Sequence, residues 1–187
     1  MREVELELAL VLLSVQGVIG AFDTFYYHEY RARLPARIPE TARELKIHAL
    51  RDFLYAFIFV CLPWVAFKGL WALLLVLVFA AEICLTLSDF VEERRSRRSQ
   101  GDVFAGERVT HAVMGIIYGA MLACAAPTVM GWWAEPAGLV VAPPDIPGWL
   151  RWSMMAMGAG VLVSGLRDLY AASGSPGGHW PWARVES

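Results

Sequence analysis

The chain has 187 residues, of which 57% are hydrophobic and only 18% are charged, and its mean hydropathy is +0.47. This composition is too apolar for an ordinary soluble domain and predicts an all-α, polytopic membrane protein whose main partner is the lipid bilayer. The net charge of −2 taken whole suggests nothing about partners, because in membrane proteins the distribution of Lys and Arg matters more than their sum. We expect no nucleic-acid partner.

Five apolar segments, each close to the roughly 20 residues that cross a bilayer as a helix, follow one another along the chain. They cover residues 6–27, 47–67, 69–90, 109–132 and 149–171. We expect the first four to form a four-helix transmembrane bundle within residues 1–132, and the fifth to be an additional transmembrane helix.

Two further stretches differ in composition from these segments. Residues 133–148 contain four prolines, lie between tryptophans and predict an outer loop. Residues 172–187 are rich in Gly and Pro and predict a flexible cytoplasmic tail.

Basic residues are concentrated in two of the connections. The connection after the first segment contains Arg31, Arg33, Arg37, Arg43 and Lys46, and the one after the third contains Arg94, Arg95, Arg97, Arg98 and Arg108. By the positive-inside rule both face the cytoplasm, which places the N-terminus outside and the C-terminus inside what we expect to be a bacterial cytoplasmic membrane. An aromatic belt then lies near the outer interface, formed by Trp64, Trp71, Trp132, Trp133, Trp149 and Trp152.

One sequence pattern occurs twice. ELKIHALRDFLY, from Glu44 to Tyr55, and ERVTHAVMGIIY, from Glu107 to Tyr118, share Glu, His and Tyr at the same spacing. Each copy begins just after an Arg-rich connection, and the residues before those connections also correspond, HEYRAR (28–33) to EERRSR (92–97). The repeat predicts two helical hairpins, residues 1–67 and 69–132, related by a pseudo-twofold axis along the membrane normal.

Ionisable side chains cluster at the cytoplasmic ends of the first four segments. Residues four apart in a helix share a face, so each Glu and His of the repeated pattern point the same way. Ordering the residues by depth predicts a shallow layer and a deeper layer in the bundle. The shallow layer is His28, Glu44, Asp89 and Glu107, and the deeper layer is Asp23, His48, Glu82 and His111.

Several neighbours of these eight residues extend the hypothesis. Asp23 and His28 are five residues apart, so either the helix loosens near residues 25–27 or only one of the two side chains points inward. We expect three side chains to orient the ligands by hydrogen bonding: Arg51, Asp52 and Thr86. Two tyrosines lie two turns deeper than the histidines and are candidate catalytic groups or ordinary packing residues: Tyr55 and Tyr118.

Carboxylates and imidazoles that converge from four helices are ligands for two divalent cations, with Fe, Mn or Zn suited to them. The pattern resembles the carboxylate di-iron bundles, including the membrane-attached alternative oxidases and the ferritin-like proteins. Those families use Glu-x-x-His motifs, whereas the spacing here is one residue longer. The resemblance implies iron as the metal and oxygen-dependent oxidation as the reaction.

The leading hypothesis is therefore a membrane-embedded di-metal oxidoreductase that acts on a hydrophobic substrate and takes electrons from a protein at the cytoplasmic face. Haem held by His48 and His111 in an electron carrier, ion transport, and a non-enzymatic subunit of a membrane complex are alternatives. Without a metal, Glu44 and Glu107 would be acidic residues favoured at helix N-termini. Asp89, Glu92 and Glu93 would similarly balance the neighbouring arginines.

Overall fold

The computed structural model describes residues 2–141 and 146–178. Within these residues the chain is all-α, as predicted, with one short ribbon of two strands. The five helices are α1 (Arg2–Phe22), α2 (Ala42–Cys61), α3 (Trp71–Ser96), α4 (Ala105–Trp133) and α5 (Gly148–Ala172). The shorter elements are a π-helix, η1 (Asp23–Arg31), the 3-10 helices η2 (Leu34–Ala36) and η3 (Arg98–Gln100), and the strands β1 (Val65–Lys68) and β2 (Gly138–Val141). Most of the predicted tail, residues 179–187, lies outside the described residues.

Three helical segments of the described chain are long and apolar enough to cross a membrane. They are Glu5–Ala36, Trp71–Ser96 and Ala105–Trp133. They correspond to the first, third and fourth predicted segments. α2 has 20 residues and α5 has 25, so both also have about the length of a bilayer crossing, but charged residues lower the apolar content of α2.

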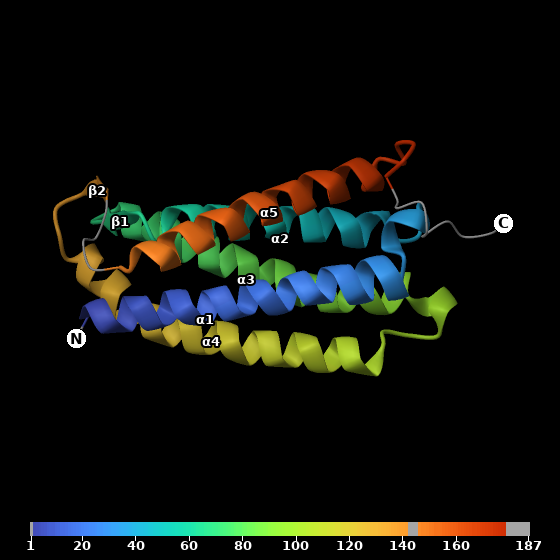
Figure 1. Cartoon of the computed structure of the whole chain (residues 1–187), viewed down its shortest axis with the longest axis horizontal. Helices are drawn as coiled ribbons and strands as arrows, with labels where there is room; N and C mark the ends of the chain where they lie inside the picture. Colours follow the sequence, from blue (N-terminus) through green and yellow to red (C-terminus); the bar gives the residue numbers. More distant parts are fainter. Residues whose placement is uncertain (1, 142–145, 179–187) are drawn as a thin grey trace.

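The helices run along one another in an elongated bundle (Figure 1). α1 packs along α4, and α2 packs along α3. Under the predicted repeat, α1 corresponds to α3 and α4 corresponds to α2, so the two packed pairs are equivalent. α5 packs most extensively on α2, which makes it an integral part of the bundle and not a peripheral addition.

The second predicted segment was too long at its C-terminal end. α2 ends at Cys61, before Pro63, and the following residues form strand β1. Proline is unfavourable inside a helix because it has no backbone N–H. β1 pairs antiparallel with β2, and Lys68 lies opposite Gly138. β2 lies inside the predicted outer loop. This ribbon closes the end of the bundle opposite the two Arg-rich connections (Figure 1).

The interior of the bundle has an apolar part and a polar part along its length. Toward the ribbon it is filled by apolar side chains, including Leu10, Leu13, Ile58, Leu75, Met121 and Met154. Toward the Arg-rich connections it contains most of the buried ionisable residues. The candidate site is therefore one end of the bundle interior.

Close packing of α5 on α2 depends on small residues. A Cβ added at Gly165 would lie 2.9 Å from the Asp52 Cβ and 3.2 Å from the Ala49 carbonyl oxygen. We expect Gly165→Ala to lower the stability of the protein in detergent by about 1–3 kcal/mol, because these atoms belong to the backbone or lie next to it and move only with α2.

The matched control is Gly160→Ala in the same helix, where an added Cβ meets nothing within 4 Å. Alanine is the better helix former, so this variant should be neutral or up to about 1 kcal/mol more stable. Thermal unfolding of both variants measures the difference, and equal stability of the two would contradict the assigned α2–α5 contact.

Candidate metal centre

The end of the first helix has the irregularity that the spacing of Asp23 and His28 demanded. Residues 23–31 form a π-helix, and the Ala32 N–H continues its pattern with a 2.7 Å bond to the carbonyl oxygen five residues back. A turn closed by such bonds contains about one more residue than an α-helical turn, so side chains five apart come to the same side. Of the two alternatives left open by the sequence, the structure has the loosened helix near residues 25–27, and the Asp23 and His28 side chains meet.

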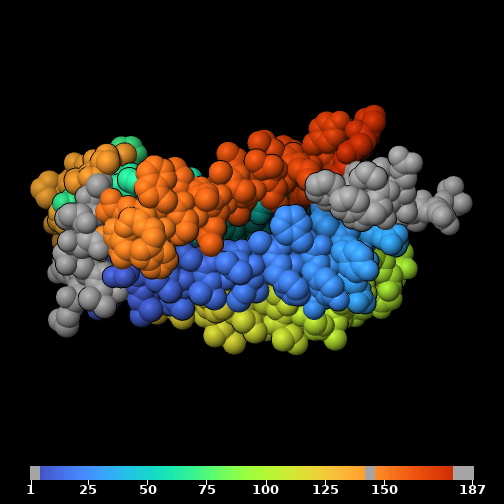
Figure 2. All heavy atoms as spheres, viewed as in Figure 1, coloured from blue at the N-terminus to red at the C-terminus, as the bar shows by residue number. Residues whose placement is uncertain are grey.

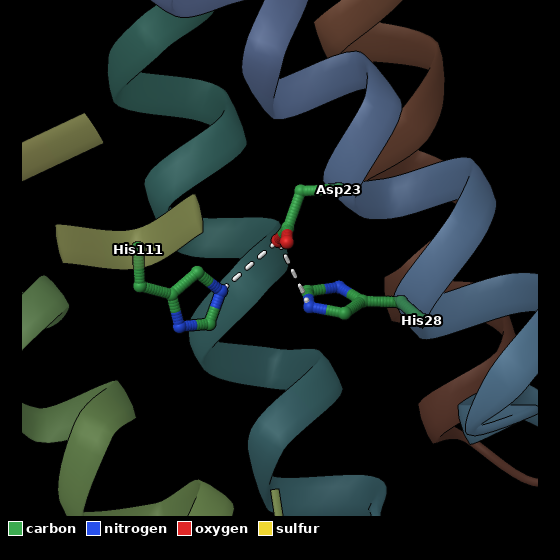
Figure 3. A group of neighbouring side chains, drawn as sticks. All are labelled: Asp23, His28 and His111. Carbon is green, nitrogen blue, oxygen red and sulfur yellow. Dashed lines mark hydrogen bonds and ion pairs between the residues drawn. The ribbon is translucent and has the colours of Figure 1, made fainter. Parts of the chain in front are cut away.

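Three buried side chains meet at this point (Figure 3). The Asp23 Oδ2 lies 3.2 Å from the His28 Nε2 and 3.0 Å from the His111 Nε2. One ligand atom from each residue lies within 4.8 Å of the other two. A carboxylate and two imidazoles at this separation form a set that can hold one divalent cation.

Two further carboxylates surround this group. The Glu107 Oε1 lies 3.4 Å from the His28 Nε2, and the Glu93 Oε1 lies 3.2 Å from the His111 Nδ1. The His111 ring therefore has one nitrogen toward Asp23 and the other toward Glu93. Metal-binding histidines are usually held in this way, with the second ring nitrogen donating to a carboxylate. The sequence had suggested only that Glu93 balances nearby arginines.

Replacing Glu93 tests its role in orienting His111. We expect Glu93→Gln to bind divalent metal about 10–100-fold more weakly than the wild type, because the ring loses the carboxylate that fixes its tautomer and orientation. Glu92→Gln is the control, since Glu92 pairs with two exposed residues, Arg43 and Arg95. Metal titration of both purified variants gives the comparison, and equal affinities would exclude this role.

A second group lies beside the first. The His48 Nε2 is 3.1 Å from the Asp89 Oδ1, and the His48 ring stacks on the His28 ring with centroids 4.6 Å apart. The other Asp89 oxygen accepts a 2.6 Å hydrogen bond from Arg51, as expected of an orienting neighbour. The His48–Asp89 pair therefore offers ligands for a second cation next to the first.

Glu82 lies deeper and has other partners. It accepts a 2.6 Å hydrogen bond from Thr86 and lies 3.5 Å from an Arg51 nitrogen. It also lies close enough to the Tyr55 and Tyr118 hydroxyls to interact with them electrostatically. Thr86 and Arg51 therefore both contact Glu82, a carboxylate that we predicted as a ligand, and the orienting role stays a prediction.

The remaining predicted residues are placed as follows. Tyr55 accepts a 2.7 Å hydrogen bond from Gln16, and its ring meets that of Tyr118 at 6.2 Å. Asp52 lies on the side of α2 that faces Gly165 of α5. Asp52 is thus placed against α5, and it is still close enough to His48 to interact with it electrostatically.

Arg97 is a residue that sequence reasoning missed. It was counted with the Arg-rich connection, yet its side chain is 0% exposed and contacts two glutamates. One guanidinium nitrogen lies 2.7 Å from Glu44 and 3.1 Å from Glu107, and Ser96 donates to Glu44. Burial alone would lower the pKa of Arg97, but these carboxylates outweigh it and raise the pKa, so Arg97 stays protonated.

All eight predicted ligands are buried at one end of the bundle, but their pairing differs from the two predicted layers. His28, assigned to the shallow layer, joins Asp23 and His111 of the deeper one. Glu44 pairs with Arg97, and Glu82 pairs with Arg51, so neither has a histidine as its nearest charged partner. Helix depth predicted the region correctly, but it did not predict the contacts within it.

The charge of this region is not balanced by its own arginines. Six buried carboxylates face two arginines, so four negative charges remain when the histidines are neutral. The carboxylates are those of Asp23, Glu44, Glu82, Asp89, Glu93 and Glu107, and the arginines are Arg51 and Arg97. Protonation of the three histidines would offset three of these charges, and two divalent cations would offset all four.

Several ligand atoms also lack hydrogen bonds within the described part of the chain. They are the Asp23 Oδ1, His28 Nε2, His48 Nε2, Asp89 Oδ1 and Glu93 Oε1. The His28 Nε2, His48 Nε2, Asp89 Oδ1 and Glu93 Oε1 each lie within 3.2 Å of a carboxylate or imidazole atom, so what they lack is a well-directed hydrogen bond. Buried polar atoms are almost always hydrogen-bonded, so nitrogens and oxygens gathered in this way fit a cation that binds them together. The residues present therefore fit a metal centre.

Haem fits less well. A porphyrin between His48 and His111 needs open space next to both rings, but the His28 ring stacks on His48 and lies 6.3 Å from His111. The Nε2 of each would-be axial ligand also faces a carboxylate, Asp89 or Asp23. These contacts argue against the haem alternative.

Comparisons with protein-family models, with curated proteins and with solved structures give no match.

Proposed function

We propose that the chain is an integral membrane protein with five spans that holds two divalent transition-metal cations, with iron the first candidate, and oxidises a hydrophobic substrate in an oxygen-dependent reaction. The observation that carries the proposal is the buried excess of carboxylates around Asp23, His28, His48, Asp89 and His111, where several imidazole and carboxylate atoms lie close together without well-directed hydrogen bonds.

The membrane topology is supported by the two ends of the bundle. Three helices have the length and apolar composition of spans, and α2 and α5 run along them. Tryptophans lie near the ribbon end, where Trp64 and Trp152 contact each other. The basic connections lie at the other end (Figure 1), which is the distribution expected for an N-terminus outside and a C-terminus inside.

The metal would be held by residues of four helical elements. Asp23 and His28 of η1 and His111 of α4 form the first ligand group, and His48 of α2 with Asp89 of α3 forms the second. When bound, iron in such a carboxylate and histidine environment supplies oxygen activation. Manganese and zinc suit the same donors, so the choice of metal is part of the proposal that experiment must decide.

The protein would contribute a dry and apolar surrounding. The core directly beyond the polar region is apolar, and Figure 2 shows a hollow between α1 and α5 with α2 at its base. A hydrophobic molecule dissolved in the bilayer would enter most easily through an opening on the side of the bundle. Exposed arginines at the end of the bundle, among them Arg94 and Arg98, would receive an acidic electron-donor protein.

Metal analysis and an absorption spectrum of the purified protein test the proposal. About two iron ions per chain without a Soret band would support it, and two manganese or zinc ions would support the site but not oxygen activation by iron. A Soret band would instead indicate haem. Protein purified without chelators that contains no metal and binds none when Fe²⁺, Mn²⁺ or Zn²⁺ is added would refute it.

A further inference from the structure

We infer that the guanidinium of Arg97, and not a metal ion, occupies the position between Glu44 and Glu107, so that Arg97 is a positioning residue of the centre and Glu44 is not a metal ligand. This inference rests on the proposed metal centre and corrects the ligand set expected from the sequence.

Glu44 is already fully engaged by protein groups. Its Oε1 lies 2.7 Å from an Arg97 nitrogen, and its Oε2 accepts a hydrogen bond from Ser96 and lies 3.5 Å from the Arg97 Nε. Both oxygens therefore face donors at the C-terminal end of α3, Ser96 in its last position and Arg97 directly after it. A carboxylate whose two oxygens are both used in this way does not need a metal ion to satisfy it.

Glu107 links Arg97 to the metal group. Its Oε1 lies 3.1 Å from Arg97 and 3.4 Å from the His28 Nε2. The guanidinium thus fixes the Glu107 carboxylate next to His28, which is one of the three residues in the Asp23 group. Through this contact Arg97 positions the centre without touching the metal ligands of that group.

Electrostatics explains why a metal ion is not needed at this position. The Arg97 and both glutamate side chains are 0% exposed, so the carboxylates need a cation close by. A planar guanidinium has donors in a fork that satisfies two carboxylates at once. A divalent ion at the same place would be repelled by it at close range.

The repeat explains why only one arginine does this. Arg97 aligns with Arg33 in the HEYRAR and EERRSR segments, yet Arg33 is only partly buried and has a backbone φ of 54° at the start of η2. Glu44 and Glu107 are the repeat-related glutamates, and both contact the same guanidinium. A single cation that serves two equivalent groups lies near the axis that relates them, where a second copy has no room.

The test measures metal content in variants purified and loaded in the same way. We expect Glu44→Gln to keep the wild-type number of ions per chain, whereas Asp23→Asn loses at least one. We expect Arg97→Gln to bind one additional Zn²⁺ or Mn²⁺ ion per chain in equilibrium dialysis, because it leaves two buried carboxylates without their cation. Arg97→Lys should restore the wild-type number, and the exposed neighbour Arg98 serves as control in Arg98→Gln.

Each outcome decides the inference. Loss of an ion in Glu44→Gln would overturn it, as would an Arg97→Gln variant that folds and gains none. If Arg97→Gln does not fold, the double variant Arg97→Gln with Glu44→Gln replaces it, because it removes one charge of each sign. This double variant must keep the wild-type number of metal ions per chain, and loss of an ion from it overturns the inference. A metal-free wild type would refute the proposed function alone, and Arg97→Gln that then acquires an ion would still support the place of Arg97.

Discussion

Alanine in place of His111 is expected to remove at least one metal ion per chain from the purified protein. It should also weaken rebinding of the metal by more than about 100-fold, which exceeds the loss expected when a group that only orients a ligand is replaced. His111 lies between two carboxylates, with its Nε2 3.0 Å from Asp23 and its Nδ1 3.2 Å from Glu93. Its loss would leave both carboxylates facing each other without a nitrogen between them. Metal content by mass spectrometry and titration of the metal-free protein measure the effect.

A matched histidine is available as the control. The chain has four histidines, and His179, which lies outside the described residues, is the one that the sequence hypothesis did not assign to the centre. His179→Ala should keep the wild-type metal content. If His111→Ala also kept it while retaining the helical signal of the wild type, the Asp23 group would be a network of ion pairs and not a metal site.

The sequence predicted which residues share the polar end of the bundle because two simple rules determine it. Helical periodicity assigns residues four apart, such as Glu44 and His48, to one face, and the positive-inside rule assigns the cytoplasmic end of each helix to one depth. All the candidate ligands are indeed buried there. The duplicated motif added that α2 and α4 contribute equivalent groups.

Which of these side chains contact one another at the polar end of the bundle was not predictable, because the contacts depend on the rotation of each helix and on which helices are neighbours. Glu93 and Arg97 belong to a run of charges that looks like a solvated loop. However, α3 extends to Ser96, so Glu93 near its end and Arg97 directly after it are both buried. The π-helix was one of two options left open by the spacing of Asp23 and His28. No local signal in residues 65–68 separated a strand from the end of an apolar helix.

The fifth helix explains a departure from the repeat. Under the alignment of the two motifs, Glu29 corresponds to Glu93, so a symmetric structure would place Glu29 beside His48. Instead Glu29 pairs with both terminal nitrogens of Arg167 on α5, at 2.9 Å for one of them. The neighbouring Asp168 lies farther from Arg167, at 3.6 Å. α5 therefore makes the two halves of the centre unequal: His111 has a carboxylate on its Nδ1, while the repeat-related Glu29 is held by Arg167.

Methionine in place of Arg51 is expected to lower the stability of the protein by about 3–5 kcal/mol, the usual cost of removing one partner from a buried charge pair. Arg51 donates a 2.6 Å hydrogen bond to Asp89 and lies 3.5 Å from Glu82. Methionine has a similar length and apolar character, so the loss would be electrostatic and not a cavity. Thermal or denaturant unfolding in detergent, with Arg94→Met as the exposed control, measures it.

The same variant separates a metal centre from a purely structural network. In a metal centre Asp89 also has a cation beside His48, so saturating Zn²⁺ or Mn²⁺ should recover part of the stability that Arg51→Met loses. In a network of ion pairs without metal, the added ion would leave the unfolding midpoint where it was. If Arg51→Met loses stability and neither ion restores any of it, Arg51 is a structural residue. The second cation site, beside His48 and Asp89, is then removed from the proposal.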